Sequence, residues 1–262
     1  MDVSQYHIID AHSHPLAEEK SCRLLLFGQE MSEEEFVSEL RAAGIEQPCG
    51  SVVKRFPAPP ESFREIQALN RAALSFRDRQ GDFYIPGVHV HPAFPVESCR
   101  ELLKMRDEHG VKFVGELVPY MMEFRDCLSP AMLEIFACIQ ELGLTVNLHL
   151  LQESDLPEIL RRFPSLKLIV AHPTADPKVY ATRLETIAQY PNAALDISGS
   201  GPNSWGMLRF GLKTAGPDKI IFGTDFPLRS PGMYVAGVLA EHLSEEERHA
   251  IFSGNFRRLL LQ

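Results

Sequence analysis

The sequence of 262 residues lacks three features that would each indicate a class of protein. It has no apolar run long enough to cross a membrane and no basic start followed by an apolar stretch, so we expect neither a membrane protein nor a signal peptide. Its five cysteines form no Cys-x-x-Cys pair, and their odd number argues against a disulfide framework. Positive charge is also scarce, because 35 acidic residues against 26 basic ones give a net charge of -9. We therefore expect reduced thiols in a cytoplasm, and the acidic balance argues against nucleic acid as a partner.

Strand-like apolar runs alternate with amphipathic helical stretches along the whole chain. We predict strands at 6–11, 50–54, 84–90, 112–118, 144–149, 166–171, 193–198 and 219–224. Several are continuous runs of Val, Ile, Leu and Phe, which is typical of parallel strands buried on both faces. Eight such strands alternating with helices predict a single α/β domain over 1–262, a (β/α)8 TIM-type barrel. An open doubly wound sheet is the alternative, but no glycine-rich phosphate loop follows the first strand.

The first predicted strand runs directly into a histidine pair. His12 and His14 stand two apart in the segment Asp10-Ala-His-Ser-His. Side chains alternate along a strand, so both rings would point to the same side. Two imidazoles on one face can bind one divalent metal ion. The pair therefore predicts a metal site at the end of this strand.

Four later residues with metal-binding side chains close predicted strands in the same way. They are Glu116, His149, His172 and Asp225. The carboxyl ends of barrel strands meet at one rim, where barrel enzymes carry their active sites, so we expect all six side chains there. The longest irregular segments, 15–31 and 55–62, also follow strands and are expected at this mouth. For Glu116 two roles stay open, a carboxylate that bridges two ions or an acceptor that holds a ligand histidine.

Other polar residues near the rim are candidates for substrate binding. His91 belongs to a second His-x-His, with His89, and could bind substrate or shuttle protons; a hydrogen-bonded pair inside the barrel is the alternative. Arg229 lies four residues beyond Asp225 and could hold a carboxylate or phosphate. Further cations that follow strands, more often solvated surface charges, are Lys54, Arg55 and Arg125. Asp196, at the end of the seventh strand, would contact substrate or tie the rim together.

Together these motifs resemble the amidohydrolase superfamily. The matching residues are Asp10-x-His12-x-His14, Glu116, His149, His172-Pro, Gly223-Thr-Asp225-Phe-Pro and, near the end, Asn255-Phe-Arg-Arg-Leu. The pattern is most similar to the amidohydrolase-related branch with aminocarboxymuconate-semialdehyde decarboxylase-like enzymes and small lactone hydrolases. The resemblance implies a distorted barrel with one or two metal ions, usually zinc. Many members carry a carboxylated lysine on the fourth strand; this chain has a glutamate there, which resembles the TatD-type deoxyribonucleases.

The resulting hypothesis is a metal-dependent hydrolase. His12, His14 and Asp225 would hold one ion, His149 and His172 a second, and Glu116 would bridge them. Asp225 would take a proton from a metal-activated water and pass it to the leaving group of a small ester, lactone, amide or phosphoester. The alternatives are a mononuclear zinc non-oxidative decarboxylase of a small carboxylic acid and a non-catalytic metal-binding barrel. A small molecule is the expected substrate, and self-association into a homo-oligomer is left open.

Overall fold

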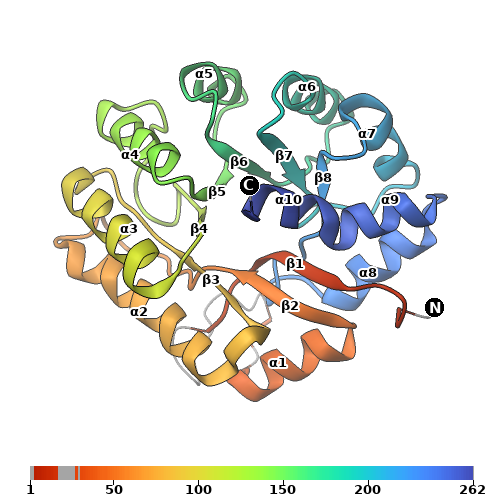
Figure 1. The fold of residues 1–262 in the computed structure, drawn as a ribbon, viewed down its shortest axis with the longest axis horizontal. Coiled ribbons are helices and arrows are strands. Elements are labelled where there is room, and N and C mark those ends of the chain that lie inside the picture. The colour runs from red at the N-terminus through yellow and green to blue at the C-terminus, as the bar shows by residue number, and fades with distance from the viewer. Residues whose placement is uncertain (1–2, 17–26, 29, 262) are drawn as a thin grey trace.

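Eight parallel strands stand side by side in the order of the sequence and are surrounded by helices (Figure 1). The computed structural model describes residues 3–16, 27–28 and 30–261. The strands are β1 (Ile8–Ser13), β2 (Ile45–Gly50), β3 (Ile85–Val88), β4 (Phe113–Leu117), β5 (Thr145–His149), β6 (Lys167–Ala171), β7 (Ala193–Asp196) and β8 (Ile220–Ile221). The α-helices are α1 (Glu33–Ala42), α2 (Phe63–Gln80), α3 (Pro95–His109), α4 (Pro130–Glu141), α5 (Asp155–Arg162), α6 (Pro177–Ala188), α7 (Met207–Ala215), α8 (Pro231–Ala240), α9 (Glu245–His249) and α10 (Asn255–Leu261). A short 3-10 helix, η1 (Gly81–Phe83), precedes β3, and a π-helix, η2 (Ala250–Gly254), joins α9 to α10.

The barrel is nearly closed where its first and last strands meet. The Ala11 N–H donates a hydrogen bond to the Phe222 carbonyl oxygen at 3.0 Å, and Ser13 forms a parallel bridge with Phe226. All other neighbouring strands pair in parallel register from β1 to β8. The predicted (β/α)8 barrel is therefore confirmed. That it is the only domain of the protein stays a prediction.

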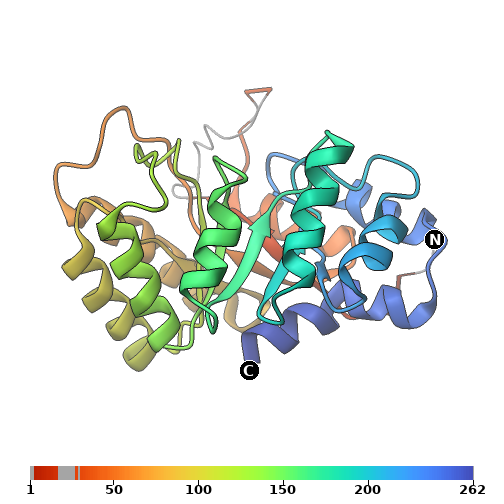
Figure 2. The ribbon, with the colours of Figure 1, turned by 90° about the horizontal axis from the view of Figure 1, so that it is seen from above.

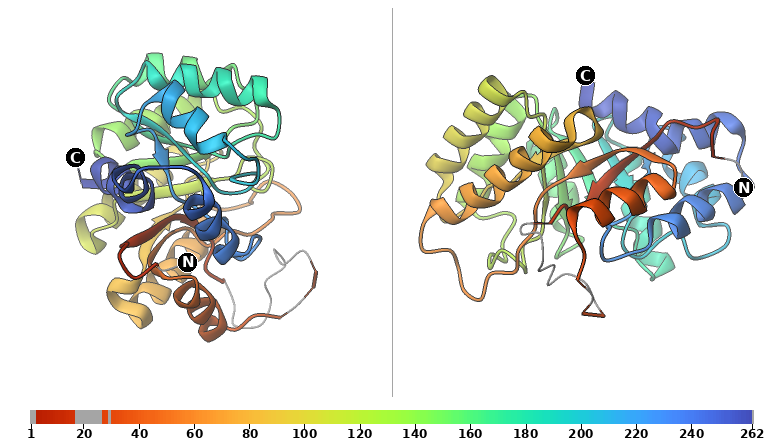
Figure 3. Two further views of the ribbon diagram at one scale, coloured as in Figure 1. Left: turned by 90° about the vertical axis from the view of Figure 1, so that its right-hand side faces the viewer. Right: turned by 90° about the horizontal axis from the view of Figure 1, so that it is seen from below.

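The C-terminal helix α10 closes one end of the barrel. Its Phe256 and Leu259 pack with Ile9, Phe113 and Ile221 inside the ring of strands. Burial of each such side chain stabilises the fold by about 1.5–3 kcal/mol. Figure 2 shows α10 at the end of the barrel opposite to the connection between β2 and α2, and both views of Figure 3 agree. The carboxyl ends of the strands therefore form the open mouth.

The second strand is the one predicted at the wrong residues. It runs over Ile45–Gly50, whereas the sequence suggested 50–54. The polar Glu46 and Gln47 and the proline between them and Cys49 weaken the apolar pattern of the true strand. A Cβ atom on Gly50 would lie 1.8 Å from the carbonyl oxygen of Ser13, so glycine is needed for this approach of β2 to the histidine segment.

Further expectations from the sequence concern the cysteines, membrane crossing, the location of the protein and its oligomeric state. Cys22 and most of the segment 15–31 lie outside the described residues, whereas Cys49, Cys99, Cys127 and Cys138 are free thiols. Within the described ranges, no helix combines the length and the apolar character that crossing a membrane requires. The cytoplasmic location and the oligomeric state stay predictions.

Candidate metal centre

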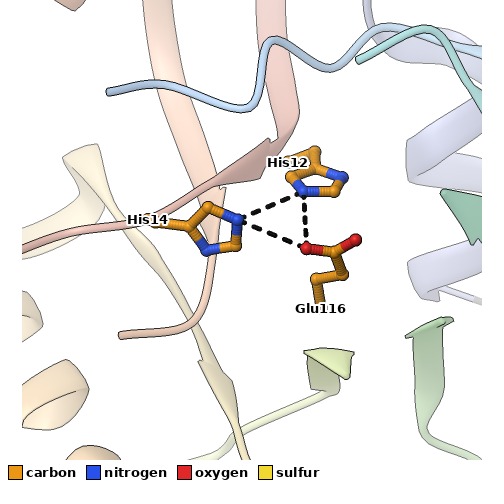
Figure 4. Close-up of side chains that lie close together, drawn as sticks. All are labelled: His12, His14 and Glu116. Carbon is orange, nitrogen blue, oxygen red and sulfur yellow. Dashed lines mark hydrogen bonds and ion pairs between the residues drawn. The ribbon is translucent and has the colours of Figure 1, made fainter. Parts of the chain in front are cut away.

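A buried carboxylate lies between the two histidines of the first strand. Glu116 Oε2 is 3.2 Å from His12 Nε2 and 3.4 Å from His14 Nε2, and the two ring nitrogens are 3.3 Å apart (Figure 4). Asp225 completes this side, with Oδ1 3.4 Å from His14 Nε2 and 3.8 Å from His12 Nε2. Four of the six predicted ligands thus converge on one point at the mouth.

The second oxygen of the same glutamate faces the other two predicted ligands. Glu116 Oε1 is 3.1 Å from His149 Nδ1 and 3.5 Å from His172 Nε2. The structure therefore brings all six residues together, with one histidine pair at each oxygen of Glu116. Among the described residues, three groups are close enough to hold a metal ion. Two of them share this carboxylate: His12, His14 and Glu116 on one side, and Glu116, His149 and His172 on the other. The third is His12, His172 and Asp196.

Hydrogen bonds between β1 and the segment after β8 fix this arrangement. The buried Asp10 accepts hydrogen bonds from the His12 N–H and the Thr224 N–H, both at 3.0 Å, and from the Thr224 hydroxyl at 2.5 Å. The Asp225 N–H donates to the His12 carbonyl oxygen at 2.7 Å. Asp225 has a positive φ of 66°, which is uncommon for a residue with a side chain. Asp10 thus ties β1, which carries His12, to the segment after β8 that carries Asp225.

The environment of the two rings favours a positive charge at the centre. His14 Nδ1 lies 3.0 Å from the Ser51 carbonyl oxygen, which can only accept, so the ring proton is on Nδ1. His12 Nδ1 likewise donates to Asp196 Oδ2 at 3.0 Å. In neutral rings, both Nε2 lone pairs would therefore face each other and the Glu116 carboxylate, with no proton between them. These donors fit a divalent metal ion, which takes imidazole nitrogen and carboxylate oxygen together.

Without a metal ion, the surrounding carboxylates favour the protonated form of His12 and His14. Burial lowers the pKa of both His12 and His14, but the surrounding carboxylates outweigh it. Glu116 and Asp196 raise the pKa of His12 well above its ordinary value, and Asp225 and Glu116 raise the pKa of His14 to about 9. Burial raises the pKa of Glu116, yet His12 and the neighbouring histidines hold it well below its usual range. A metal ion would replace these protons.

The ring nitrogens of His91, the histidine predicted to bind substrate, contact backbone groups. His91 Nε2 donates to the Met122 carbonyl oxygen at 2.8 Å, and its Nδ1 accepts from the Ala93 N–H at 3.1 Å. Both ring nitrogens are therefore used by backbone groups. Substrate binding by His91 stays a prediction without support from its contacts.

Two arginines flank the centre. The Arg229 Nε–H donates to the Gly199 carbonyl oxygen at 3.2 Å, and Gly199 lies so close to His172 that a Cβ would be 2.6 Å from its ring. Arg55 lies over the ring of Tyr120, with its guanidinium carbon 5.5 Å from the ring centre. The Tyr120 ring in turn meets the His149 ring edge-on at 5.1 Å. Arg229 is thus linked to His172 through Gly199, and Arg55 is linked to His149 through Tyr120.

Three polar residues behind the centre were missed or left undecided by sequence reasoning. Asp196 binds His12 rather than the rim, and the buried Ser198 and Asn147 both bind Asp196. Ser198 also contacts His172 Nδ1 at 2.7 Å. The one sequence signal was the polar spacing of Asp196 and Ser198 after the apolar part of β7, which places both on one face.

The family is decided by a match that extends over almost the whole chain. Residues 9–261 match the amidohydrolase family. The chain belongs to the amidohydrolase family. This membership and the cluster of histidines and glutamate support a divalent metal at the centre. No curated protein matches the chain.

Several solved structures share the fold of this amidohydrolase. One is 5-carboxyvanillate decarboxylase from Sphingomonas paucimobilis, with 13% identity and a TM-score of 0.73, covering 98% of this chain and 99% of that one. The same enzyme from Novosphingobium aromaticivorans, complexed with manganese and a nitrobenzoic acid, has 16% identity and a TM-score of 0.74, covering 99% and 97%. For 2,6-dihydroxybenzoate decarboxylase from Rhizobium the identity is 15% and the TM-score 0.68, covering 98% and 99%.

These neighbours contradict the predicted hydrolysis. All three are decarboxylases of aromatic acids, so the main functional prediction from the sequence, a hydrolase of esters, lactones, amides or phosphoesters, is wrong. The prediction rested on the number and type of ligands. Such ligands hold a metal ion in the same way whichever bond the enzyme breaks. The decarboxylase alternative agrees better with the neighbours.

Proposed function

We propose that this amidohydrolase is a metal-dependent, non-oxidative decarboxylase of a small aromatic carboxylic acid. The observation that carries the proposal is the single carboxylate of Glu116 between two histidine pairs, at the mouth of a barrel. The similarity of that barrel to three aromatic-acid decarboxylases over nearly their full length supports the choice of reaction.

One divalent ion would be held by His12, His14, Glu116 and Asp225. Manganese is supported by the neighbour from Novosphingobium aromaticivorans, and zinc is the metal implied by the family resemblance. When bound, the ion supplies positive charge that attracts substrate oxygen atoms and stabilises negative charge as it develops. A second ion between Glu116, His149 and His172 stays a prediction.

Asp225 is the proposed proton donor. Loss of CO2 breaks a carbon–carbon bond and leaves its electron pair on the substrate carbon, which must then receive one proton. The Asp225 side chain is 11% exposed, the most open of the carboxylates at the centre, and Oδ1 lies 3.4 Å from His14 Nε2. In its protonated form it would deliver the proton to that carbon and recover one from solvent.

The two arginines and one aromatic ring are the proposed substrate contacts. Arg229 and Arg55 can each bind a carboxylate, because a guanidinium offers two parallel N–H donors. An aromatic substrate could stack beside Tyr120, whose ring already contacts His149 and Arg55. This arrangement favours an acid with a ring and at least one anionic group.

The test measures the released product. Protein stripped with a chelator is reloaded with Mn²⁺ or Zn²⁺ and incubated with hydroxybenzoic acids and related aromatic acids, and CO2 is measured. In D2O, the product should carry one deuterium at the carbon that lost the carboxylate. The variant Asp225→Asn should lose this activity, whereas Asp78→Asn, on the exposed surface of α2, should keep it.

The outcome separates the proposal from its alternatives. CO2 release that depends on metal and on Asp225 would support it. A fully metal-loaded protein that releases no CO2 from any acid of the panel would contradict it.

A further inference from the structure

The side of the metal centre away from the mouth is closed by three buried polar residues. Asp196, Ser198 and Asn147 are each inaccessible to solvent. The Ser198 hydroxyl donates to Asp196 Oδ1, and the Asn147 amide donates to Asp196 Oδ2 at 2.8 Å. The Ser198 N–H adds a further hydrogen bond to Asp196 Oδ1 at 3.0 Å. The carboxylate is therefore held rigidly by donors from β5 and from the end of β7.

This cluster contacts one histidine of each pair. His12 Nδ1 lies 3.0 Å from Asp196 Oδ2 and also 3.0 Å from Ser198 Oγ. His172 Nδ1 lies 2.7 Å from Ser198 Oγ. The carboxylate thus accepts a hydrogen bond from His12 directly, whereas its hydrogen-bonded link to His172 runs through the serine hydroxyl.

The number of protons fixes the direction of these hydrogen bonds. A serine hydroxyl has a single proton, and Asp196, which can only accept, takes it. Ser198 Oγ can then only accept from His172, so the ring proton of His172 must be on Nδ1. The lone pair of His172 Nε2 consequently points towards Glu116 Oε1, 3.5 Å away. The ring has little freedom to turn away, because Gly199 packs against it.

We propose that Ser198 is a positioning residue, which transmits the charge of Asp196 to His172 and holds that ring in the tautomer that offers Nε2 to a metal ion. Asp196 does the same for His12 without an intermediary. One carboxylate therefore prepares a histidine from each pair, and the serine joins the two sides of the centre. This inference rests on the second ion of the proposed function, the one between Glu116, His149 and His172, and is independent of decarboxylation.

The first measurement needs only the native protein without metal. Nitrogen-15 NMR of the histidine rings distinguishes a proton on Nδ1 from one on Nε2. The spectra are recorded at about pH 8, above the ordinary pKa of a histidine ring, so that the tautomer of a neutral ring can be read. We expect the proton of His172 on Nδ1. A proton on Nε2 would overturn the proposal before any variant is made.

The second measurement uses Ser198→Ala, which removes the hydroxyl and leaves the carboxylate. We expect a mixture of His172 tautomers in the metal-free variant. Competition with a coloured chelator should show an affinity for Mn²⁺ or Zn²⁺ lower by about 10- to 100-fold, the usual effect of removing a group that orients a ligand. Ser198→Thr keeps a hydroxyl and should restore the tautomer if it folds.

A matched control separates positioning from packing. Ser98 is also fully buried, and its hydroxyl hydrogen-bonds the backbone of His91, outside the metal centre. Ser98→Ala should leave both the His172 tautomer and the metal affinity unchanged. If Ser198→Ala keeps the native tautomer and the native affinity, the positioning role is refuted even though metal binding and CO2 release remain. If the native protein binds no metal, the proposed function fails instead, while the tautomer measurement still tests Ser198.

Discussion

Replacement of Arg183 by methionine should destabilise the ends of the two strands that carry the second histidine pair. Arg183 lies in α6 and is 6% exposed. Its guanidinium donates to the carbonyl oxygen of His172 and forms a two-pronged ion pair with Glu153, which follows His149 in the connection after β5. Methionine keeps most of the apolar stem and removes every one of these hydrogen bonds.

The expected magnitude follows from what each partner loses. Removing one member of a fully buried ion pair costs about 3–5 kcal/mol, because the other charge stays buried. Glu153 is 39% exposed, so water can replace much of what the arginine provided, and this contribution falls below that range. The His172 carbonyl oxygen loses a charged donor, which costs about 1.5–3 kcal/mol. We expect a total loss of about 3 kcal/mol in the free energy of unfolding.

The assay is urea denaturation of metal-free protein, followed by circular dichroism. Arg183→Met, Glu153→Gln and the double variant form a cycle whose coupling energy isolates the pair. Arg161→Met is the control, because Arg161 pairs with Glu158 on the surface and should change stability by no more than about 0.5 kcal/mol. An Arg183 variant as stable as that control, or a cycle without coupling, would refute the reasoning.

Three further predictions concern the centre itself. Asp225→Asn should lower the rate of CO2 release by about 100- to 10,000-fold with metal content retained, and equal losses of rate and metal would reduce Asp225 to a ligand. Glu116→Gln removes the charge that both histidine pairs face, so chelator competition should show metal affinity reduced by more than about 100-fold; native affinity would exclude Glu116 as a ligand. Burial and the nearby His14 lower the pKa of His89 to about 4, so the unfolded chain binds more protons as pH falls from about 6.5 to 4, and stability is lost over that window by up to about 3 kcal/mol. His89→Gln should flatten this loss in urea denaturation at pH 7 and pH 4.5, and an unchanged slope would contradict it.

The strand ends and their ligand-type residues could be predicted because both signals are local. Continuous apolar runs mark buried parallel strands, and a histidine or carboxylate that closes such a run has only the rim to occupy. The second strand was predicted at the wrong residues. Glu46 and Gln47 interrupt its apolar pattern, while Val52 and Val53 beyond it are buried. There the apolar pattern followed burial beyond the end of the strand and not the strand itself; Val53 packs with Val118 and Met121, which follow β4.

The residues behind the ligands could not be predicted, because their roles depend on contacts between distant parts of the chain. Ser198 contacts His12 across a separation of 186 residues, and Asn147 donates a hydrogen bond to Asp196 from another strand. Serine and asparagine occur throughout the sequence without such roles, so residue type gives little signal. Arg229 was predicted to bind substrate because it follows Asp225 closely, and that role stays a prediction. The contact of Arg55 with Tyr120, and through it with the second histidine pair, could be recognised only in the fold.

Neither the sequence pattern nor the geometry of the ligands distinguishes hydrolysis from decarboxylation. Either reaction needs a cation near substrate oxygen atoms and a carboxyl group that can move one proton. The roles proposed for His12, His14, Glu116 and Asp225 would meet both needs. The difference is where the proton goes: to the heteroatom of a leaving group after water attacks, or to the carbon that has lost CO2. That choice depends on which substrate bond the mouth holds against Asp225, and so on the connections that follow the strands. The position of deuterium in the product reports the destination of the proton directly, and no inventory of ligands can replace that measurement.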